Sequence, residues 1–140
     1  MRPSIDSYFL QIAQVVASRS TCLHRKVGCL LVKDGHAISM GYNGAPSGLE
    51  HCDTAGCTKP TSGQRHELCR ATHSEANAII QAALHGCSPE GGTLYSTHEP
   101  CLMCSKMLIN AKIKRVVFME SYNDGGGIWL KAAGIEVIKI

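Results

Sequence analysis

The chain has 140 residues, 44% of them hydrophobic and 18% charged, and its net charge is +3. This composition excludes a disordered chain, and the length predicts one domain over residues 1–140 rather than two. The small, scattered charge excludes the basic patch of a nucleic-acid-binding protein, and no apolar run is long enough to span a membrane.

The first part of the chain predicts a helix, a β-hairpin and a long loop. Apolar residues recur at helical spacing over residues 4–19, and Ser4 is suited to cap the start of that helix. Residues 27–32 and 36–40 are rich in strand formers and flank an Asp-Gly turn, which is a strong hairpin signal. Residues 41–72 contain many turn residues and are expected to form a loop. This loop is unusually long for a segment without secondary structure of its own. The N-terminus has no signal-peptide core, so we expect a cytoplasmic protein without nucleic-acid or membrane partners.

The second part of the chain alternates helices and strands. Helices are expected over residues 74–84, 101–109 and 128–133, and strands over residues 93–97, 115–119 and 135–140. Such alternation is typical of an α/β fold with helices on the faces of a sheet. We therefore expect a three-layer α/β/α sandwich with a five-stranded mixed sheet, which begins with an antiparallel N-terminal β-hairpin and is otherwise mostly parallel.

Two short segments carry the residue types of a zinc site. His73-Ser74-Glu75 and Pro100-Cys101-Leu102-Met103-Cys104 each stand where a helix is expected to begin. His73, Cys101 and Cys104 supply three ligands that zinc accepts, which leaves the fourth tetrahedral position for water. Glu75 would lie beside that water and accept its proton without binding the metal. A C-x-x-C pair alone also fits a redox pair or a non-enzymatic zinc-binding module, and neither of these needs Glu75.

H-x-E followed by P-C-x-x-C is typical of zinc nucleobase deaminases. In these segments, and over nearly its whole length, the chain resembles the cytidine and deoxycytidylate deaminase family. The loop Gly41-Tyr42-Asn43-Gly44-Ala45-Pro46-Ser47-Gly48 favours deoxycytidylate (dCMP) deaminases over zinc deaminases of cytosine, guanine or tRNA adenosine. Ser74 is a departure, since the family pattern has Ala after the zinc-binding His. The resemblance implies the cytidine deaminase-like fold and hydrolysis of dCMP to dUMP and ammonia, which feeds thymidylate synthesis.

The resemblance also suggests how a nucleotide substrate is held. Asn43 matches an Asn that binds the sugar 3′-hydroxyl in relatives, although a turn residue with positive φ is an alternative role for it. Arg25 or Lys26 could supply the cation that a 5′-phosphate needs. Both could equally be solvated surface charges.

A second, structural zinc is expected in the long loop. Cys22 and Cys52 match positions used for such a zinc in some dCMP deaminases, and Cys69 with either Cys57 or His66 would complete a tetrahedral set. The alternative is that these cysteines are reduced, partly buried thiols, as is expected of Cys29 and Cys87.

Regulation is the last expectation that the resemblance carries. Many similar enzymes are homohexamers that dCTP activates and dTTP inhibits, so a homo-oligomer with a magnesium-bound nucleotide triphosphate effector is expected. The effector would lie on the glycine-rich loop, whose backbone N–H groups can approach phosphate. The residues assigned to it are Gly41, Tyr42, Asn43, Gly44 and Gly48. Alternatively, these glycines only shape a turn and the enzyme is unregulated.

Overall fold

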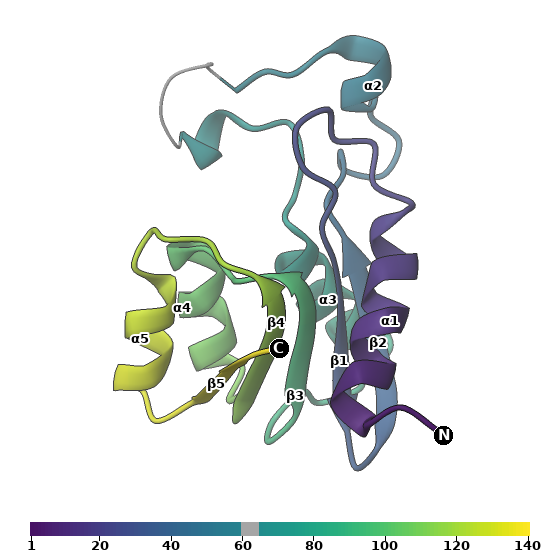
Figure 1. The fold of residues 1–140 in the computed structure, drawn as a ribbon. Coiled ribbons are helices and arrows are strands. Elements are labelled where there is room, and N and C mark those ends of the chain that lie inside the picture. Colours follow the sequence, from purple (N-terminus) through teal and green to yellow (C-terminus); the bar gives the residue numbers. More distant parts are fainter. Residues whose placement is uncertain (60–64) are drawn as a thin grey trace.

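The computed structural model describes residues 1–59 and 65–140, which form an α/β fold (Figure 1). Residues 60–64, within the predicted 41–72 loop, lie outside the described residues. The helices are α1 (Ile5–Ala17), α2 (Cys52–Ala55), α3 (Ser74–Leu84), α4 (Leu102–Asn110) and α5 (Gly126–Ala132), with a 3-10 helix η1 (His66–Leu68). The strands are β1 (Gly28–Lys33), β2 (His36–Tyr42), β3 (Thr93–His98), β4 (Arg115–Glu120) and β5 (Glu136–Lys139). In the described part of the chain, every helix is too short or too polar to cross a membrane.

The five strands form one mixed sheet in the order β2-β1-β3-β4-β5. β1 pairs antiparallel with both β2 and β3, whereas the β3–β4 and β4–β5 pairs are parallel. The predicted mixed sheet with an N-terminal hairpin is therefore confirmed, but the expectation of a mostly parallel remainder is wrong at the β1–β3 pair. The crossover through α3 makes β3 run in the same direction as β2, so β1, which lies between them, is antiparallel to both.

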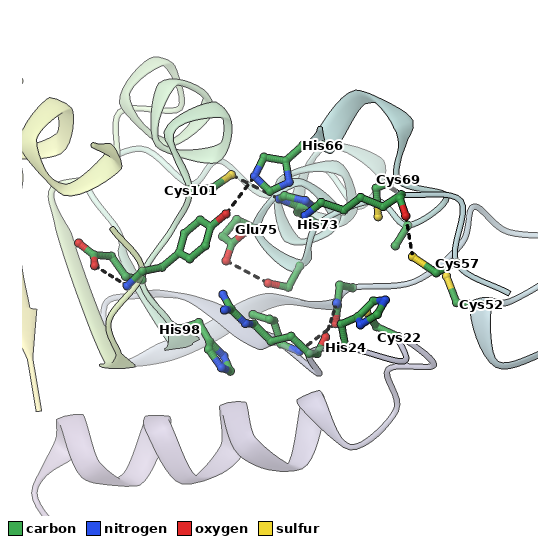
Figure 2. A pocket seen from close by; sticks show the side chains of 18 residues that line it. Cys22, His24, Cys52, Cys57, His66, Cys69, His73, Glu75, His98 and Cys101 are labelled. Atoms are coloured by element: carbon green, nitrogen blue, oxygen red, sulfur yellow. Dashed lines mark hydrogen bonds between the residues drawn. The ribbon is translucent and has the colours of Figure 1, made fainter. Parts of the chain in front are cut away.

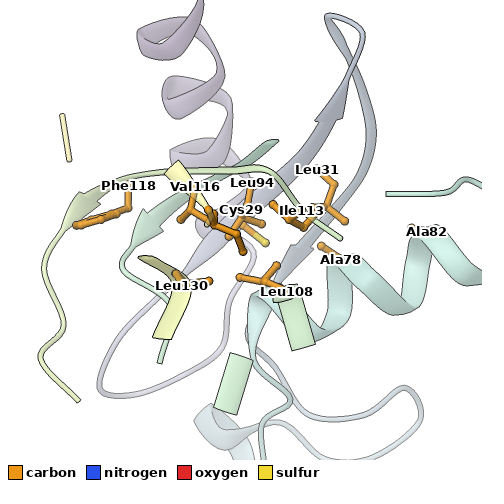
Figure 3. Packing of buried hydrophobic residues seen from close by; sticks show 11 residues of the cluster. Cys29, Leu31, Ala78, Ala82, Leu94, Leu108, Ile113, Val116, Phe118 and Leu130 are labelled. Carbon is orange, nitrogen blue, oxygen red and sulfur yellow. The ribbon is translucent and has the colours of Figure 1, made fainter. Parts of the chain in front are cut away.

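Helices cover both faces of the sheet and give the predicted three layers. α1 packs on one face through a buried cluster that contains Phe9, Leu10, Val16, Leu30, Val32, Tyr95 and Val117. α3, α4 and α5 cover the other face, where the cluster contains Cys29, Leu31, Ala78, Ala82, Leu94, Leu108, Ile113, Val116, Phe118, Leu130 and Ile135 (Figure 3). Successive β1 residues alternate between the two clusters because side chains of a strand point to opposite faces.

Local signals in the sequence explain several element boundaries. The Ser4 hydroxyl accepts the N–H of Ser7 at 3.2 Å and caps α1 as predicted. Asp34 and Gly35 both have positive φ, 52° and 77°, which confirms the Asp-Gly hairpin turn. α5 begins two residues before the predicted start, at Gly126, where a Cβ would lie 2.5 Å from the carbonyl oxygen of Pro100. Only glycine allows this close approach of α5 to the start of α4.

The long loop is more structured than expected. It contains α2 and η1, whose four and three residues are too short to produce a periodic apolar pattern. Its two ends are tied together where Gly44 and Thr72 exchange backbone hydrogen bonds of 3.2 and 2.8 Å. Figure 1 shows this insert standing beyond the end of the sheet at which α3 begins.

Candidate active site

A cavity of about 380 Å³ lies where the carboxyl ends of β3 and β4 meet the start of α3. Open α/β sheets bind ligands at this edge, because the loops that leave neighbouring strands converge there. Insert residues and the segment before β1 complete the wall (Figure 2). The lining residues include Arg25, Asn43, Lys59, His66, His73, Glu75, His98, Glu99, Cys101 and Tyr122.

The three predicted zinc ligands come together beside this cavity. His73 Nδ1 lies 3.4 Å from the Sγ atoms of both Cys101 and Cys104. Tetrahedral zinc with nitrogen at ~2.1 Å and sulfur at ~2.3 Å separates those two atoms by about 3.6 Å, so the donor set fits this metal. Cys101 caps α4 and accepts the N–H of Cys104 on its sulfur at 3.4 Å.

The electrostatics of the cluster favour the charged form of Cys101. The pKa of the Cys101 thiol is lowered well below its usual value, chiefly because the Cys104 thiol donates a hydrogen bond to it, with help from His73. The same Cys101–His73 contact raises the pKa of His73. A thiolate is the form of cysteine that binds metals. Within residues 1–59 and 65–140, no fourth metal-binding side chain joins the three within 4.8 Å.

Glu75 lies in the first turn of α3 and is 4% exposed. One of its oxygens, Oε1, accepts a hydrogen bond from the Ser74 hydroxyl at 3.1 Å. Burial raises the pKa of the Glu75 carboxyl, and hydrogen bonding to Cys104 and the charge of nearby His73 act against that rise. A carboxyl group with a raised pKa beside a metal cluster is suited to carry protons at neutral pH.

Two further aromatic side chains lie against the cluster. The His66 ring packs edge-on against the His73 ring, with 4.8 Å between the ring centres. The Tyr122 hydroxyl lies 3.2 Å from His66 Nε2, and the Arg25 guanidinium lies 4.9 Å from the centre of the Tyr122 ring. This chain of contacts links the insert, the segment before β1 and the loop after β4 around one cavity.

The comparisons with known proteins agree with this geometry. The family of the cytidine and deoxycytidylate deaminase zinc-binding region matches residues 3–120. The chain belongs to the cytidine and deoxycytidylate deaminase family. Its fold is close to that of the dCMP deaminase of cyanophage S-TIM5 in complex with dCMP and dUMP, with a TM-score of 0.85 and 32% identity over 100% of this chain and 99% of the phage chain.

Two curated relatives extend the comparison. The deoxycytidylate deaminase of Saccharomyces cerevisiae is 40% identical over 98% of this chain and 45% of its own length. That of Mycobacterium phage D29 is 41% identical over 84% of this chain and 95% of its own length. The chain thus spans less than half of the yeast relative and nearly all of the phage relative.

The side chain of Asn43 is largely occupied by hydrogen bonds within the protein. Its Oδ1 accepts the Ser20 hydroxyl at 2.6 Å and the Val27 N–H at 2.8 Å, while its Nδ2 donates to the Arg25 carbonyl oxygen at 2.8 Å. A side-chain amide has two N–H groups, so one remains for a ligand in the cavity that Asn43 lines. Arg25 also lines that cavity, whereas Lys26 is exposed and is not part of the lining.

The five candidate ligands of a second metal separate into two places. Cys22, Cys52, Cys57 and Cys69 gather at one end of the cavity (Figure 2), and burial together with the nearby Cys22, Cys69 and Cys57 raises the pKa of Cys52. In the described ranges, no three of these sulfur atoms approach within 4.8 Å. His66 instead lies near the cluster of His73, Cys101 and Cys104, within 4.8 Å of metal-binding atoms of Cys101 and Asp124.

The glycine-rich loop is packed into the fold at its start. A Cβ at Gly41 would lie 2.2 Å from the carbonyl oxygen of Ser74, so glycine is needed for close contact between β2 and α3. The backbone groups of Gly44 pair with Thr72. Tyr42 and Gly48 are exposed, and Gly48 has a positive φ of 87° with open space around it.

Several lining residues were absent from the sequence-based site. They include His24, Lys59, His98, Glu99 and Tyr122. Glu99 accepts the N–H of Tyr122 at 2.8 Å, and Asp124 outside the lining accepts the N–H of Leu102 at the start of α4 at 2.8 Å. His98 and Glu99 directly precede the P-C-x-x-C motif, which is the one signal that could have found them. Tyr122 has no comparable signal.

Proposed function

We propose that this chain is a zinc-dependent dCMP deaminase that hydrolyses dCMP to dUMP and ammonia. The observation that carries the proposal is the buried Glu75 beside the His73, Cys101 and Cys104 cluster in one cavity. The match over nearly the whole chain to a solved dCMP deaminase supports the choice of substrate.

His73, Cys101 and Cys104 would hold the catalytic zinc. When bound, zinc supplies a Lewis acid that makes water nucleophilic at neutral pH. The two thiol ligands are presented by the first turn of α4, whose free N–H groups and dipole stabilise negative charge.

Glu75 performs the proton transfers. It accepts a proton from the attacking water and delivers it to N3 of the cytosine ring, which makes C4 more electrophilic. After the attack on C4, Glu75 takes the proton of the new C4 hydroxyl group and delivers it to the amino group. The C4–N bond then breaks, the C4 carbonyl forms and ammonia leaves. Burial raises the pKa of this carboxyl, which helps it to take up a proton during the reaction.

The remaining lining residues would select a nucleotide. Internal hydrogen bonds leave one N–H of the Asn43 side-chain amide free, and we propose that it donates to the sugar 3′-hydroxyl. Arg25 is the better candidate for the 5′-phosphate, because it lines the cavity and rests on Tyr122, whereas Lys26 does not line it. Lys59, also in the lining, adds a second positive charge at the same cavity.

We also propose a structural zinc at Cys22, Cys52, Cys57 and Cys69. The support is their grouping at one end of the cavity and the burial of Cys52. Of the two alternatives for the fourth ligand, Cys57 fits better than His66, which packs on His73 instead. Zinc would draw the four sulfur atoms together and tie the insert to the segment that follows α1.

Assembly and regulation complete the proposal. Ile128 and Trp129 on α5 are 74% and 51% exposed, and they border a groove with Ile109, Ala132 and Ala133. Such an apolar groove supports a homo-oligomer, for which we propose a hexamer.

The exposed Tyr42 and Gly48 are the parts of the glycine-rich loop best placed for a dCTP or dTTP effector with magnesium.

Ammonia release from separate solutions of dCMP, CMP, deoxycytidine, cytosine and guanine tests the substrate. We expect dCMP to be deaminated with the highest kcat/KM. Deoxycytidine should be a poor substrate, because it has no phosphate and leaves the phosphate-binding cation unpaired. Equal kcat/KM for dCMP and deoxycytidine, or preference for a free base, would contradict the proposal.

A further inference from the structure

Ser74 is a buried polar residue that the proposed mechanism does not use. It is 1% exposed and stands between the zinc ligand His73 and the proton carrier Glu75, where the family pattern has Ala. Burying a hydroxyl group is costly unless it finds a hydrogen-bond partner. Its partner here is Glu75 Oε1, at 3.1 Å.

The direction of this hydrogen bond follows from chemistry. An ionised carboxylate can only accept, so the Ser74 hydroxyl must donate its single proton to Oε1. Ser74 also lies beside Cys29, a fully buried β1 residue. Burial raises the pKa of Cys29 well above its usual range, so this residue retains its thiol proton. A line of contacts therefore runs from the sheet, through Ser74, to one oxygen of Glu75.

The Ser74 contact also differs from the other side-chain contact of Glu75. Cys104 lies within hydrogen-bonding reach of the same carboxyl, but as a thiolate ligand of zinc it has no proton to donate. The hydroxyl of Ser74 keeps its proton whether or not a metal is bound. It is thus the side-chain donor that remains available to Glu75 throughout a catalytic cycle.

We infer that Ser74 is a positioning residue, which holds Oε1 of Glu75 and leaves Oε2 as the oxygen that carries the proton between water and cytosine. A glutamate side chain has three rotatable bonds, and a carboxylate that must meet two partners in turn gains from having one oxygen fixed. The inference rests on the proposed deaminase function. It assigns to this chain a contact that Ala at the same position cannot make.

Ser74→Ala tests this role, with Ser105→Ala as the matched control. Both serines are fully buried, each directly follows a zinc ligand, and each lies in the first turns of its helix. Ser105 differs because its hydroxyl has no hydrogen-bond partner in the described structure. We expect Ser74→Ala to lower kcat for dCMP by about three- to tenfold, the effect of losing one hydrogen bond to the reacting group, with KM and bound zinc unchanged. Ser105→Ala should leave kcat within twofold of the wild type.

Two further variants separate positioning from packing. Ser74→Thr keeps the hydroxyl and should restore most of kcat, including in the case where Ser74→Ala proves unstable. In a Glu75→Gln background, Ser74→Ala should lower the residual rate no further, because the two residues act through one carboxylate. The absorption spectrum of the cobalt-substituted enzyme should be the same in wild type and Ser74→Ala, which would show that the ligand geometry is intact.

These measurements distinguish a failure of the proposed deaminase function from a failure of the role of Ser74. A wild-type enzyme that does not deaminate dCMP would refute the proposed function, and the inference would fall with it. An active wild type whose Ser74→Ala variant keeps its kcat, raises only KM or loses zinc would overturn the role of Ser74 alone. So would a Ser74→Thr variant as slow as Ser74→Ala.

Discussion

Glu75 is the residue on which the proposed chemistry depends most directly. Glu75→Gln keeps the size of the side chain but removes its ability to take up a proton, so it should bind zinc and fold normally yet lose activity. General acid–base catalysis alone contributes roughly 10²–10⁴-fold, and Glu75 serves several transfers, so we expect a loss of at least ~10³-fold in kcat. Metal content and the melting curve provide the controls, and turnover close to that of the wild type would remove Glu75 from the mechanism.

Site residues that lie in short local motifs could be predicted from the sequence, whereas residues brought together from distant parts of the chain could not. His73, Cys101 and Cys104 stand in two short motifs at helix starts, and helix geometry fixes how such neighbours point. Tyr122 reaches the same cavity from the loop after β4 and contacts His66 from the insert, 56 positions earlier. That contact depends on how the insert folds back over the sheet, which no local pattern contains. For the same reason the sequence left His66 open as a ligand of the second metal.

At the level of elements, α1 is fixed to the sheet by a partly buried ion pair. The carboxylate of Asp6 accepts two hydrogen bonds from Arg115 on β4, of 2.8 and 2.7 Å, and a third from the Tyr95 hydroxyl at 2.7 Å. The bonds from Arg115 hold the pKa of Asp6 below its usual value, and burial together with bonding to Asp6 raises the pKa of Tyr95 to about 12. The anchor ties the first turn of α1 to β3 and β4.

This ion pair predicts a pH-dependent stability. A carboxyl whose pKa is lowered by folding stabilises the protein above its unfolded pKa of ~3.9, and the effect is lost as the pH falls through the lower folded value. Asp6→Asn should therefore reduce the free energy of unfolding by about 1–3 kcal/mol at pH 6, and the difference from wild type should shrink below pH ~4. Denaturant unfolding at a series of pH values measures this. Glu136→Gln is the control, because Glu136 contacts the same Arg115 at 3.4 Å but is 64% exposed, and a pH-independent difference for Asp6→Asn would contradict the account.

The insert is the element whose order should depend on the proposed structural zinc. Cys52→Ser removes one of its ligands, and structural zinc in small motifs supplies apparent binding energies of ~10–16 kcal/mol that are coupled to folding. We expect the zinc content to fall from two ions per chain to one, and protease cleavage within the insert to become faster. Cys87→Ser, which changes a partly buried cysteine near the end of α3, should change neither. One zinc per chain in the intact wild type would contradict the second site.

The element boundaries show where sequence signals were sufficient. The hairpin turn and the cap of α1 follow from residues adjacent in sequence, and both were predicted correctly. The start of α5 was misplaced because Gly126 and Gly127 are poor helix formers. Glycine is needed at 126 because this residue packs closely against Pro100 and Ser105, and this tertiary contact outweighs the low helix propensity of glycine.

At the scale of the whole molecule, the exposed apolar groove between α4 and α5 predicts assembly. Trp129→Glu places a charge in that groove and should shift the protein to a smaller mass in light scattering, since burying an unpaired charge opposes association. Val15→Glu is the control, because Val15 is 70% exposed on α1, on the other side of the sheet. A wild-type monomer, or an unchanged mass of Trp129→Glu, would contradict this interface.

The proposed regulation by nucleotides would depend on the whole assembly. Tyr42 and Gly48 are exposed on the glycine-rich loop, while Gly41 at its start packs against the backbone of Ser74, beside Glu75. A ligand that binds this loop more tightly in one of two conformations would therefore move the first turn of α3, and with it the carboxylate that carries the protons. We expect dCTP with magnesium to lower the dCMP concentration for half-saturation by about fivefold or more, and dTTP to raise it, since coupling between sites is commonly of that size. Saturation curves for dCMP with and without each nucleotide measure the effect, and hyperbolic curves that neither nucleotide changes would show that the loop only shapes a turn.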